Sequence, residues 1–272
     1  MNQRWIIIAG SILAVLIVVV LIGRNKSEHP SSPVSSTTGE AKKLYEEAAR
    51  LESNGQKLEA KAAYQKIVNE YSDFEQMEAI QKHLGDISLD IILSNVETPD
   101  NTEIREVQAG DSLGKIAKQY NTTVDLIKQS NGLTSDVIRV GQRLRIWKGK
   151  FSVFVDKSQN ILILKNDNDV VKVYNVSTGL NNSTPVGTFK VTSKLVDPVW
   201  FKSGAVVPPE SPANVLGTRW MGFDMAGYGI HGTTEPDKIG QQVTAGCVRM
   251  RNEEVEQLYT LIPVGTEVTI QD

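Results

Sequence analysis

The residues of this sequence best suited to covalent chemistry are a cysteine and a histidine in its C-terminal half. Cys247 is the only cysteine in the chain, and His231 is the only histidine after His83. A thiol needs a base and an acidifying partner to act as a nucleophile near neutral pH, and a histidine supplies both. Thiol chemistry in this half would therefore pair Cys247 with His231.

Arg249 follows the cysteine by two residues. If Cys247 opens a β-strand, side-chain alternation puts Arg249 on the same face and toward the same cleft. The plainer alternative is a cysteine that is a small buried hydrophobe and a histidine that is only a loop residue. The surroundings favour chemistry, because both residues lie in glycine-bearing segments, 228–232 and 245–247, where the backbone can approach a substrate closely.

The segments around these residues resemble the catalytic domain of L,D-transpeptidases of the YkuD type, over residues 150–272. The family pattern is a histidine-glycine pair, here His231-Gly232, followed about sixteen residues later by glycine, cysteine, a branched residue and arginine. The similarity also covers residues 184–190, 217–222, 239–240 and 248–250. Many members carry Ser-His before the glycine-cysteine pair, where this chain has Thr244 and Ala245, so a second imidazole is missing.

The resemblance implies cysteine-dependent acyl transfer in the cell wall. Cys247 would attack the third residue of a peptidoglycan tetrapeptide stem and expel the terminal D-alanine. His231, oriented by the carbonyl of Gly232, would take the thiol proton or hold it in a thiolate–imidazolium pair. A side-chain amine of a second stem would then attack the thioester and crosslink two third residues, whereas water would make the enzyme an L,D-carboxypeptidase.

Other residues would complete this site. The backbone N–H groups of Gly246 and Cys247 are candidate oxyanion donors, because preorganised donors stabilise the developing charge. Arg249 carries a permanent charge suited to a substrate carboxylate. The candidates for substrate binding are Trp220, Tyr228 and Thr244, the tryptophan being equally suited to the core. Three loop carboxylates are expected to be solvated and to have no acid–base role: Glu210, Glu235 and Asp237.

Two other classes of protein stay open. A sortase also joins cysteine, histidine and arginine on a β-barrel, but its arginine lies further from the cysteine, and no sortase resembles residues 220–233. A non-catalytic peptidoglycan-binding protein would need an inert Cys247 thiol. No metal or cofactor is expected, because one cysteine and three scattered histidines do not make a zinc site. The net charge of -3 gives no indication of nucleic-acid binding.

The catalytic region is expected to be mainly β, a sandwich or barrel of antiparallel strands. Runs of β-branched and apolar residues separated by turn-rich stretches predict strands at 151–155, 161–164 and 170–176. Asn252 is predicted to cap a short helix over 253–261, and residues 266–270 are predicted to close the domain as a strand.

Residues 103–148 resemble a LysM domain, an α+β module of βααβ order that binds polymers containing N-acetylglucosamine. Asp111 or Ser112 is predicted to cap its first helix and Thr122 or Thr123 its second. Val140 stands where many members have proline. The resemblance implies peptidoglycan as the ligand, unless the module is only a spacer, and few residues join it to the catalytic region, so the two are expected to work independently. The candidate glycan-binding residues are Gly110, Asp111, Ser112, Asn131 and Gly132.

Residues 41–97 carry apolar residues at helical spacing, with a break at Ser53-Asn54-Gly55. The run from Gly55 to Lys66 resembles one tetratricopeptide-type unit. One unit is below the number needed for a stable array. The segment is therefore expected to be a small helical spacer or, alternatively, a docking site for a protein partner.

An uninterrupted apolar run without charge extends from Trp5 to Ile22. As a helix it would span roughly 27 Å, about the thickness of the hydrocarbon layer. It is longer than a usual signal-peptide core and lacks a small-x-small cleavage site after Ile22. Residues 1–26 are therefore predicted to be a retained transmembrane anchor and residues 27–40 a flexible linker. The expected location is the cell membrane, with the catalytic region outside the cytoplasm, although basic residues on both flanks leave the orientation open.

Overall fold

The computed structural model describes residues 34–202 and 204–272. The predicted anchor, residues 1–26, lies outside the described residues, as does the first half of the predicted linker. None of the helices in the described ranges is long and apolar enough to cross a membrane. The chain divides between Ser88 and Leu89 into two compact units.

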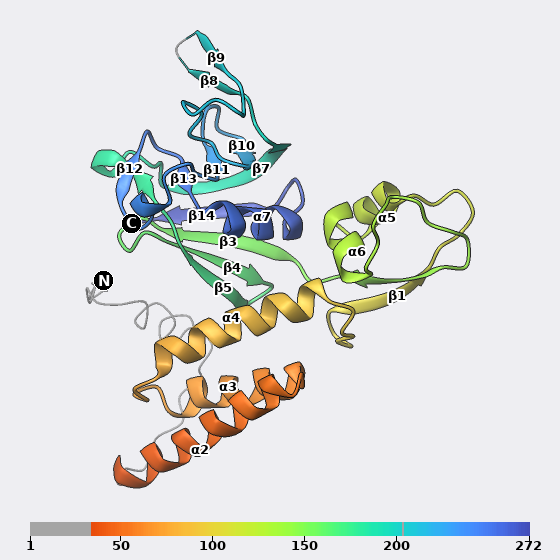
Figure 1. Cartoon of the computed structure of the whole chain (residues 1–272), viewed down its shortest axis with the longest axis vertical. Helices are drawn as coiled ribbons and strands as arrows, with labels where there is room; N and C mark the ends of the chain where they lie inside the picture. Colours follow the sequence, from red (N-terminus) through yellow and green to blue (C-terminus); the bar gives the residue numbers. More distant parts are fainter. Residues whose placement is uncertain (1–33, 203) are drawn as a thin grey trace, which may run out of the picture. The chain divides into compact units, whose positions relative to one another are not determined.

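The described part of the first unit consists of helices (Figure 1): α2 (Val34–Ser53), α3 (Lys57–Glu70) and most of α4 (Met77–Leu93). The predicted break between the first two is confirmed, and Gly55 adopts a φ of 74° there, a conformation that favours glycine. Ala60 and Ile67 of α3 and Ile80 of α4 are fully buried, as their helical spacing predicts. The tetratricopeptide character of this segment stays a prediction.

The LysM region has the expected βααβ order. Strands β1 (Thr102–Glu106) and β2 (Arg143–Trp147) pair antiparallel, with α5 (Leu113–Gln119) and α6 (Val124–Ser130) between them in sequence. Of the predicted caps, Ser112 accepts a hydrogen bond from the backbone of Lys115, and Thr123 accepts one from the backbone of Leu126. The local sequence was therefore sufficient to place both helix starts.

One eight-stranded sheet forms the described catalytic region (Figure 1), in the order β13-β11-β10-β7-β14-β3-β4-β5. Its strands are β3 (Phe151–Asp156), β4 (Ile161–Asn166), β5 (Asp169–Asn175), β7 (Gly187–Val196), β10 (Arg219–Phe223), β11 (Gly229–His231), β13 (Val248–Arg249) and β14 (Glu267–Gln271). Two short ladders accompany it: β6 (Thr178–Gly179) with β12 (Gln242–Thr244), and β8 (Trp200–Lys202) with β9 (Ala205–Val207).

The mainly-β prediction is confirmed, but the expectation of purely antiparallel strands is wrong. Strand β14 runs parallel to β3, and β11 runs parallel to β13. Parallel neighbours need a crossover connection. The segment between β11 and β13 and the chain between β3 and β14 supply these crossovers. The sheet is open, with β13 and β5 at its edges.

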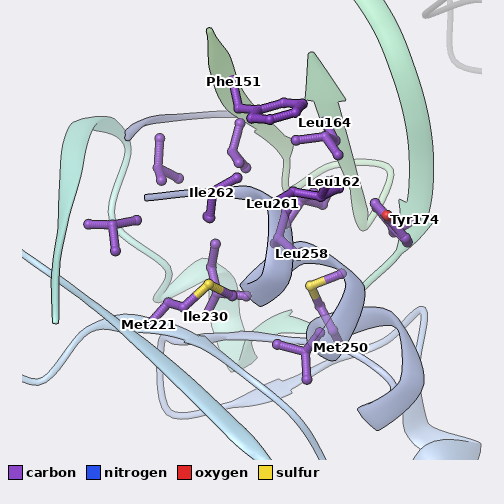
Figure 2. Close-up of a cluster of buried hydrophobic side chains, with 14 of the residues drawn as sticks. Phe151, Leu162, Leu164, Tyr174, Met221, Ile230, Met250, Leu258, Leu261 and Ile262 are labelled. Atoms are coloured by element: carbon purple, nitrogen blue, oxygen red, sulfur yellow. The ribbon is translucent and has the colours of Figure 1, made fainter. Parts of the chain in front are cut away.

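Helix α7 (Asn252–Leu261) packs on β10 and β11 and closes the core drawn in Figure 2. Its residues Val255, Leu258 and Leu261 are fully buried. They join a single apolar cluster with the strand residues Leu162, Leu164, Met221, Ile230 and Val248 and with Met250, which follows β13. Because side chains alternate along a strand, the neighbours of Met221, Ile230 and Val248 face away from this core.

Asn252 does not cap α7, contrary to the prediction. Arg251 occupies the N-cap position, and Asn252 is the first helical residue. The Asn252 side chain instead hydrogen-bonds to the backbone of Thr218 and Thr233, which lie in two different loops. The hydrogen-bonding groups of the Asn252 amide are therefore used by these two loops and not by the N-terminus of α7.

Candidate active site

The predicted catalytic residues meet at the parallel pairing of β11 and β13. His231 lies directly opposite Arg249 in this register. In-register neighbours of a parallel pair project to the same face. Cys247 lies in the turn immediately before β13, and its Sγ donates to the carbonyl oxygen of Gly227 at 3.5 Å. The positive charge of Arg249 accordingly acts to lower the pKa of both His231 and Cys247.

The His231 ring is fixed by its surroundings. Its Nδ1 lies 2.7 Å from the carbonyl oxygen of Gly232, which can only accept, so Nδ1 carries the proton and the neutral ring has its lone pair on Nε2. Trp220 stacks against the ring with centroids 6.0 Å apart and an interplanar angle of 22°. The ring is therefore held in the tautomer that a general base requires.

Burial disfavours charge on both members of the pair. It lowers the pKa of His231 to about 4, although hydrogen bonds to the backbone of Gly232 and Leu216 act in the opposite direction. Burial also raises the pKa of the Cys247 thiol, against the effects of a backbone hydrogen bond from Gly229 and the charge of Arg249. Of the two resting states expected from the sequence, these directions favour the neutral thiol beside the neutral imidazole.

A tight turn presents the half-buried thiol of Cys247. The Thr244 hydroxyl donates to the carbonyl of Cys247 at 2.6 Å and accepts from the N–H of Gly246 at 3.2 Å. Gly246 has a φ of 130°, and a Cβ there would lie 2.7 Å from the ring of Tyr228. Thr244 and Tyr228, expected to contact substrate, thus shape the turn. Thr244 also engages the N–H of Gly246, which leaves the N–H of Cys247 as the stronger oxyanion candidate.

Arg249 is paired with a carboxylate that the sequence led us to regard as solvated. Its Nη1 lies 3.1 Å from Oε2 of Glu235, and only 8% of the Arg249 side chain is exposed. Lys238 and Arg249 both lower the pKa of Glu235, the hydrogen bond from Lys238 being the larger cause. The only sequence signal for this pair was that Glu235 closely follows His231.

The candidate glycan-binding residues of the LysM region use their polar groups inside the module. Asp111 accepts from Arg105 and from the N–H of Gln108, and Ser112 caps α5. Asn131 joins the end of α6 to β2 through both backbone polar groups of Arg145, at 2.7 and 2.8 Å. Gly110 and Gly132 adopt φ values of 85° and 63° at turns. These positions shape the fold of the module.

Comparison with known proteins agrees with this site. Residues 150–270 match the model of the L,D-transpeptidase catalytic domain, and residues 106–147 match that of the LysM domain. The chain is 45% identical over 126 residues to YqjB of Bacillus subtilis (strain 168), named as an L,D-transpeptidase, with 44% of this chain and 70% of that protein covered. It is 28% identical over 172 residues to YkuD of the same strain, covering 61% of this chain and 96% of that protein. The chain therefore belongs to the L,D-transpeptidase family.

Solved structures also resemble the chain. For L,D-transpeptidase 3 from Mycobacterium tuberculosis the TM-score is 0.40 at 20% identity, covering 49% of this chain and 66% of that chain. For the catalytic domain of the Enterococcus faecium L,D-transpeptidase the TM-score is 0.38 at 21% identity, covering 45% of this chain and 98% of that chain.

Proposed function

We propose that this protein is a cell-wall L,D-transpeptidase that crosslinks peptidoglycan stems through a cysteine acyl-enzyme. The observation that carries the proposal is the pairing of β11 with β13, which sets His231 opposite Arg249 and places Cys247 in the turn directly before β13. A half-buried thiol in the turn before β13 and a histidine of fixed tautomer on the adjacent strand β11 are the groups that nucleophilic acyl transfer requires.

In the acylation step, Nε2 of His231 takes the Cys247 proton as Sγ attacks the carbonyl carbon of the third stem residue. The N–H of Cys247 stabilises the resulting oxyanion. When the tetrahedral intermediate collapses, the bond to the fourth residue breaks, and the imidazolium returns its proton to the amine of the departing D-alanine. A thioester on Cys247 remains.

In the transfer step, His231 takes a proton from the side-chain amine of a second stem as that amine attacks the thioester. Collapse forms the new amide and returns the proton to the Cys247 sulfur. Arg249 stabilises the negative charge that develops on sulfur in both steps. A role for Arg249 in holding a substrate carboxylate would require displacement of Glu235, which now occupies its guanidinium.

The decisive experiment incubates the full chain with a disaccharide-tetrapeptide and a tripeptide acceptor, followed by mass spectrometry of protein and products. We expect an acyl adduct on Cys247, release of D-alanine and a crosslinked dimer. Cys247→Ala, which removes one sulfur atom from a partly open site, should keep the fold and lose both adduct and dimer. Disaccharide-tripeptide without dimer would identify a carboxypeptidase, and the absence of any adduct would leave only a wall-binding protein.

We further propose that the protein binds peptidoglycan through its LysM module and acts on the outer side of the cell membrane. The apolar run Trp5–Ile22 supports an anchor because it has the length of a membrane span. The test is the mass of the mature protein isolated from membranes, which should include this run. A mature form that begins near Ser27 and is free in solution would contradict the anchor.

A further inference from the structure

We propose that Asn252 is a positioning residue for His231, acting through the peptide bond between Gly232 and Thr233. This inference rests on the proposed function only in that His231 is taken to be the base. Asn252 contacts neither the thiol nor the imidazole in the described structure. Its influence passes through the backbone that holds the ring.

The peptide unit between Gly232 and Thr233 is held at both of its polar ends. Its carbonyl lies 2.7 Å from Nδ1 of His231, and its N–H donates to Oδ1 of Asn252 at 2.9 Å. A peptide unit is planar, so fixing the N–H fixes the direction of the carbonyl. Asn252 Nδ2 also donates to the carbonyl of Thr233 at 2.9 Å, so the amide pairs with both polar groups of that residue.

The same amide holds a second loop beside the ring. Oδ1 of Asn252 accepts from the N–H of Thr218 at 3.2 Å. A Cβ on Gly217 or on Gly232 would lie 2.2 Å from this oxygen, so both glycines are needed to admit the amide. This second loop also includes Leu216, whose backbone acts to raise the pKa of His231.

The element that carries the amide is rigid. Asn252 opens α7, whose residues Val255, Leu258 and Leu261 are fully buried in the core of the catalytic region. A histidine keeps a single tautomer when its second nitrogen has a fixed partner. Without the amide, the Gly232 carbonyl is free to turn away from Nδ1, and the imidazole can then place its proton on Nε2, where it no longer acts as a base.

The test combines a spectroscopic and a kinetic measurement. The chain has only three histidines, so 15N labelling of histidine gives a spectrum simple enough to assign the His231 tautomer. We expect the Nδ1–H form in the wild type and a mixture of both tautomers in Asn252→Ala. The rate of Cys247 acylation in Asn252→Ala should fall at least tenfold, while KM for the tetrapeptide should change less than twofold.

Asn252→Asp is the conservative variant. It keeps acceptors for the N–H groups of Thr218 and Thr233, so the Nδ1–H tautomer should persist. Its negative charge favours the imidazolium form, so the low-pH limb of the acylation profile should move to higher pH. This shift decides the proposal even if Asn252→Ala does not fold, because an unshifted limb would place the amide out of electrostatic reach of the ring and overturn it.

Asn166→Ala is the matched control. Asn166 is also a buried asparagine, and it accepts from Trp147 Nε1 at 3.1 Å and donates to Asn101 at 3.3 Å, away from the catalytic turn. It should lower the melting temperature without changing tautomer or acylation. An unchanged tautomer in Asn252→Ala, or an equal loss of acylation in Asn166→Ala, would overturn the proposal. The tautomer is read without substrate, so a wild-type protein that transfers no acyl group would refute the proposed function and still leave Asn252 testable.

Discussion

Among single residues, Cys247 and His231 show how burial opposes the ionisation of a candidate nucleophile and of its candidate base. Both groups are drawn toward their neutral forms by burial, and the charge of Arg249 is largely matched by Glu235. A neutral imidazole is available as a base at any pH well above its pKa of about 4. In the proposed mechanism the thiol therefore becomes a thiolate only as it reacts, with the proton moving directly to His231.

The first prediction is that alkylation of Cys247 by a small thiol reagent is slow at pH 6 and accelerates at least tenfold by pH 9. The reason is that the raised pKa keeps the thiol protonated at the lower pH. The denatured protein is the reference, since the same single thiol then titrates near its ordinary pKa of about 8.5. Rapid alkylation of the folded protein at pH 6 would instead indicate a preformed thiolate–imidazolium pair.

The second prediction concerns stability. Because the pKa of His231 is lower in the folded than in the unfolded state, the unfolded chain binds a proton first as the pH falls. Stability should be complete above the unfolded pKa of about 6.5 and should decrease by about 2 kcal/mol between pH 7 and 5 from this group alone. Urea unfolding of wild type and His231→Gln at both pH values measures it. Equal losses in the two proteins would show that the ring is not buried neutral.

The sequence pointed to the candidate reactive residues but not to those that position them. Short spacing joined His231 to Gly232 and Cys247 to Arg249. The partners of Asn252 lie 34 and 19 residues away in sequence and are backbone groups, which carry no side-chain signature. Glu235 was overlooked for a related reason, because its partner is reached only once β11 and β13 pair.

At the scale of elements, the turn before β13 places the Cys247 thiol next to the pairing of β11 with β13. In the catalytic region, four of the eight strands of the main sheet, β3, β4, β5 and β14, followed from local patterns, as did helix α7, although its N-cap did not. The parallel pairing of β11 with β13 did not, because the alternation within a strand is the same in either direction. That pairing brings His231 and Arg249 into register, so the element least visible in the sequence is the one that assembles the site.

The third prediction is that Thr244→Val slows acylation of Cys247 about tenfold. The variant keeps the shape of the side chain but removes the hydroxyl that bridges Gly246 and Cys247, leaving a buried N–H without its partner at a cost of about 1–3 kcal/mol. Thr244→Ser should retain the rate. Thr266→Val, which removes a buried hydroxyl bonded to Pro263 elsewhere, should lower stability alone. Equal acylation rates in both valine variants would refute the role of the Thr244 hydroxyl.

At the scale of the whole molecule, the LysM and catalytic regions are less independent than the sequence suggested. Both belong to the second compact unit. Leu126 of α6 is buried in the core cluster of the catalytic region, and the hydroxyl of Thr123 donates to the carbonyl of Thr260 on α7. Local sequence does not predict either contact. An apolar residue on a short helix such as α6 can pack in the LysM core or in the core of the catalytic region.

The fourth prediction uses two neighbouring residues of α6 that serve different cores. Leu126→Ala should destabilise the catalytic region by about 2–5 kcal/mol and accelerate hydrogen exchange in α7. Ile127, equally buried but packed in the LysM cluster, is the control, and Ile127→Ala should accelerate exchange in α5 and β2 instead. Identical exchange patterns in the two variants would mean that the regions unfold as one body, and unchanged exchange in α7 would mean that Leu126 contributes nothing to it.

The position of Leu126 in the core of the catalytic region limits the transfer of this LysM module to another enzyme. Grafting a wall-binding module from one enzyme to another assumes that a flexible linker alone joins the module to the catalytic domain. In this chain an exchanged module must also supply an apolar side chain of the size of Leu126, which fills a position in the core of the catalytic region. A grafted module without such a side chain would still bind the wall, but it would leave a cavity in the core of the catalytic region.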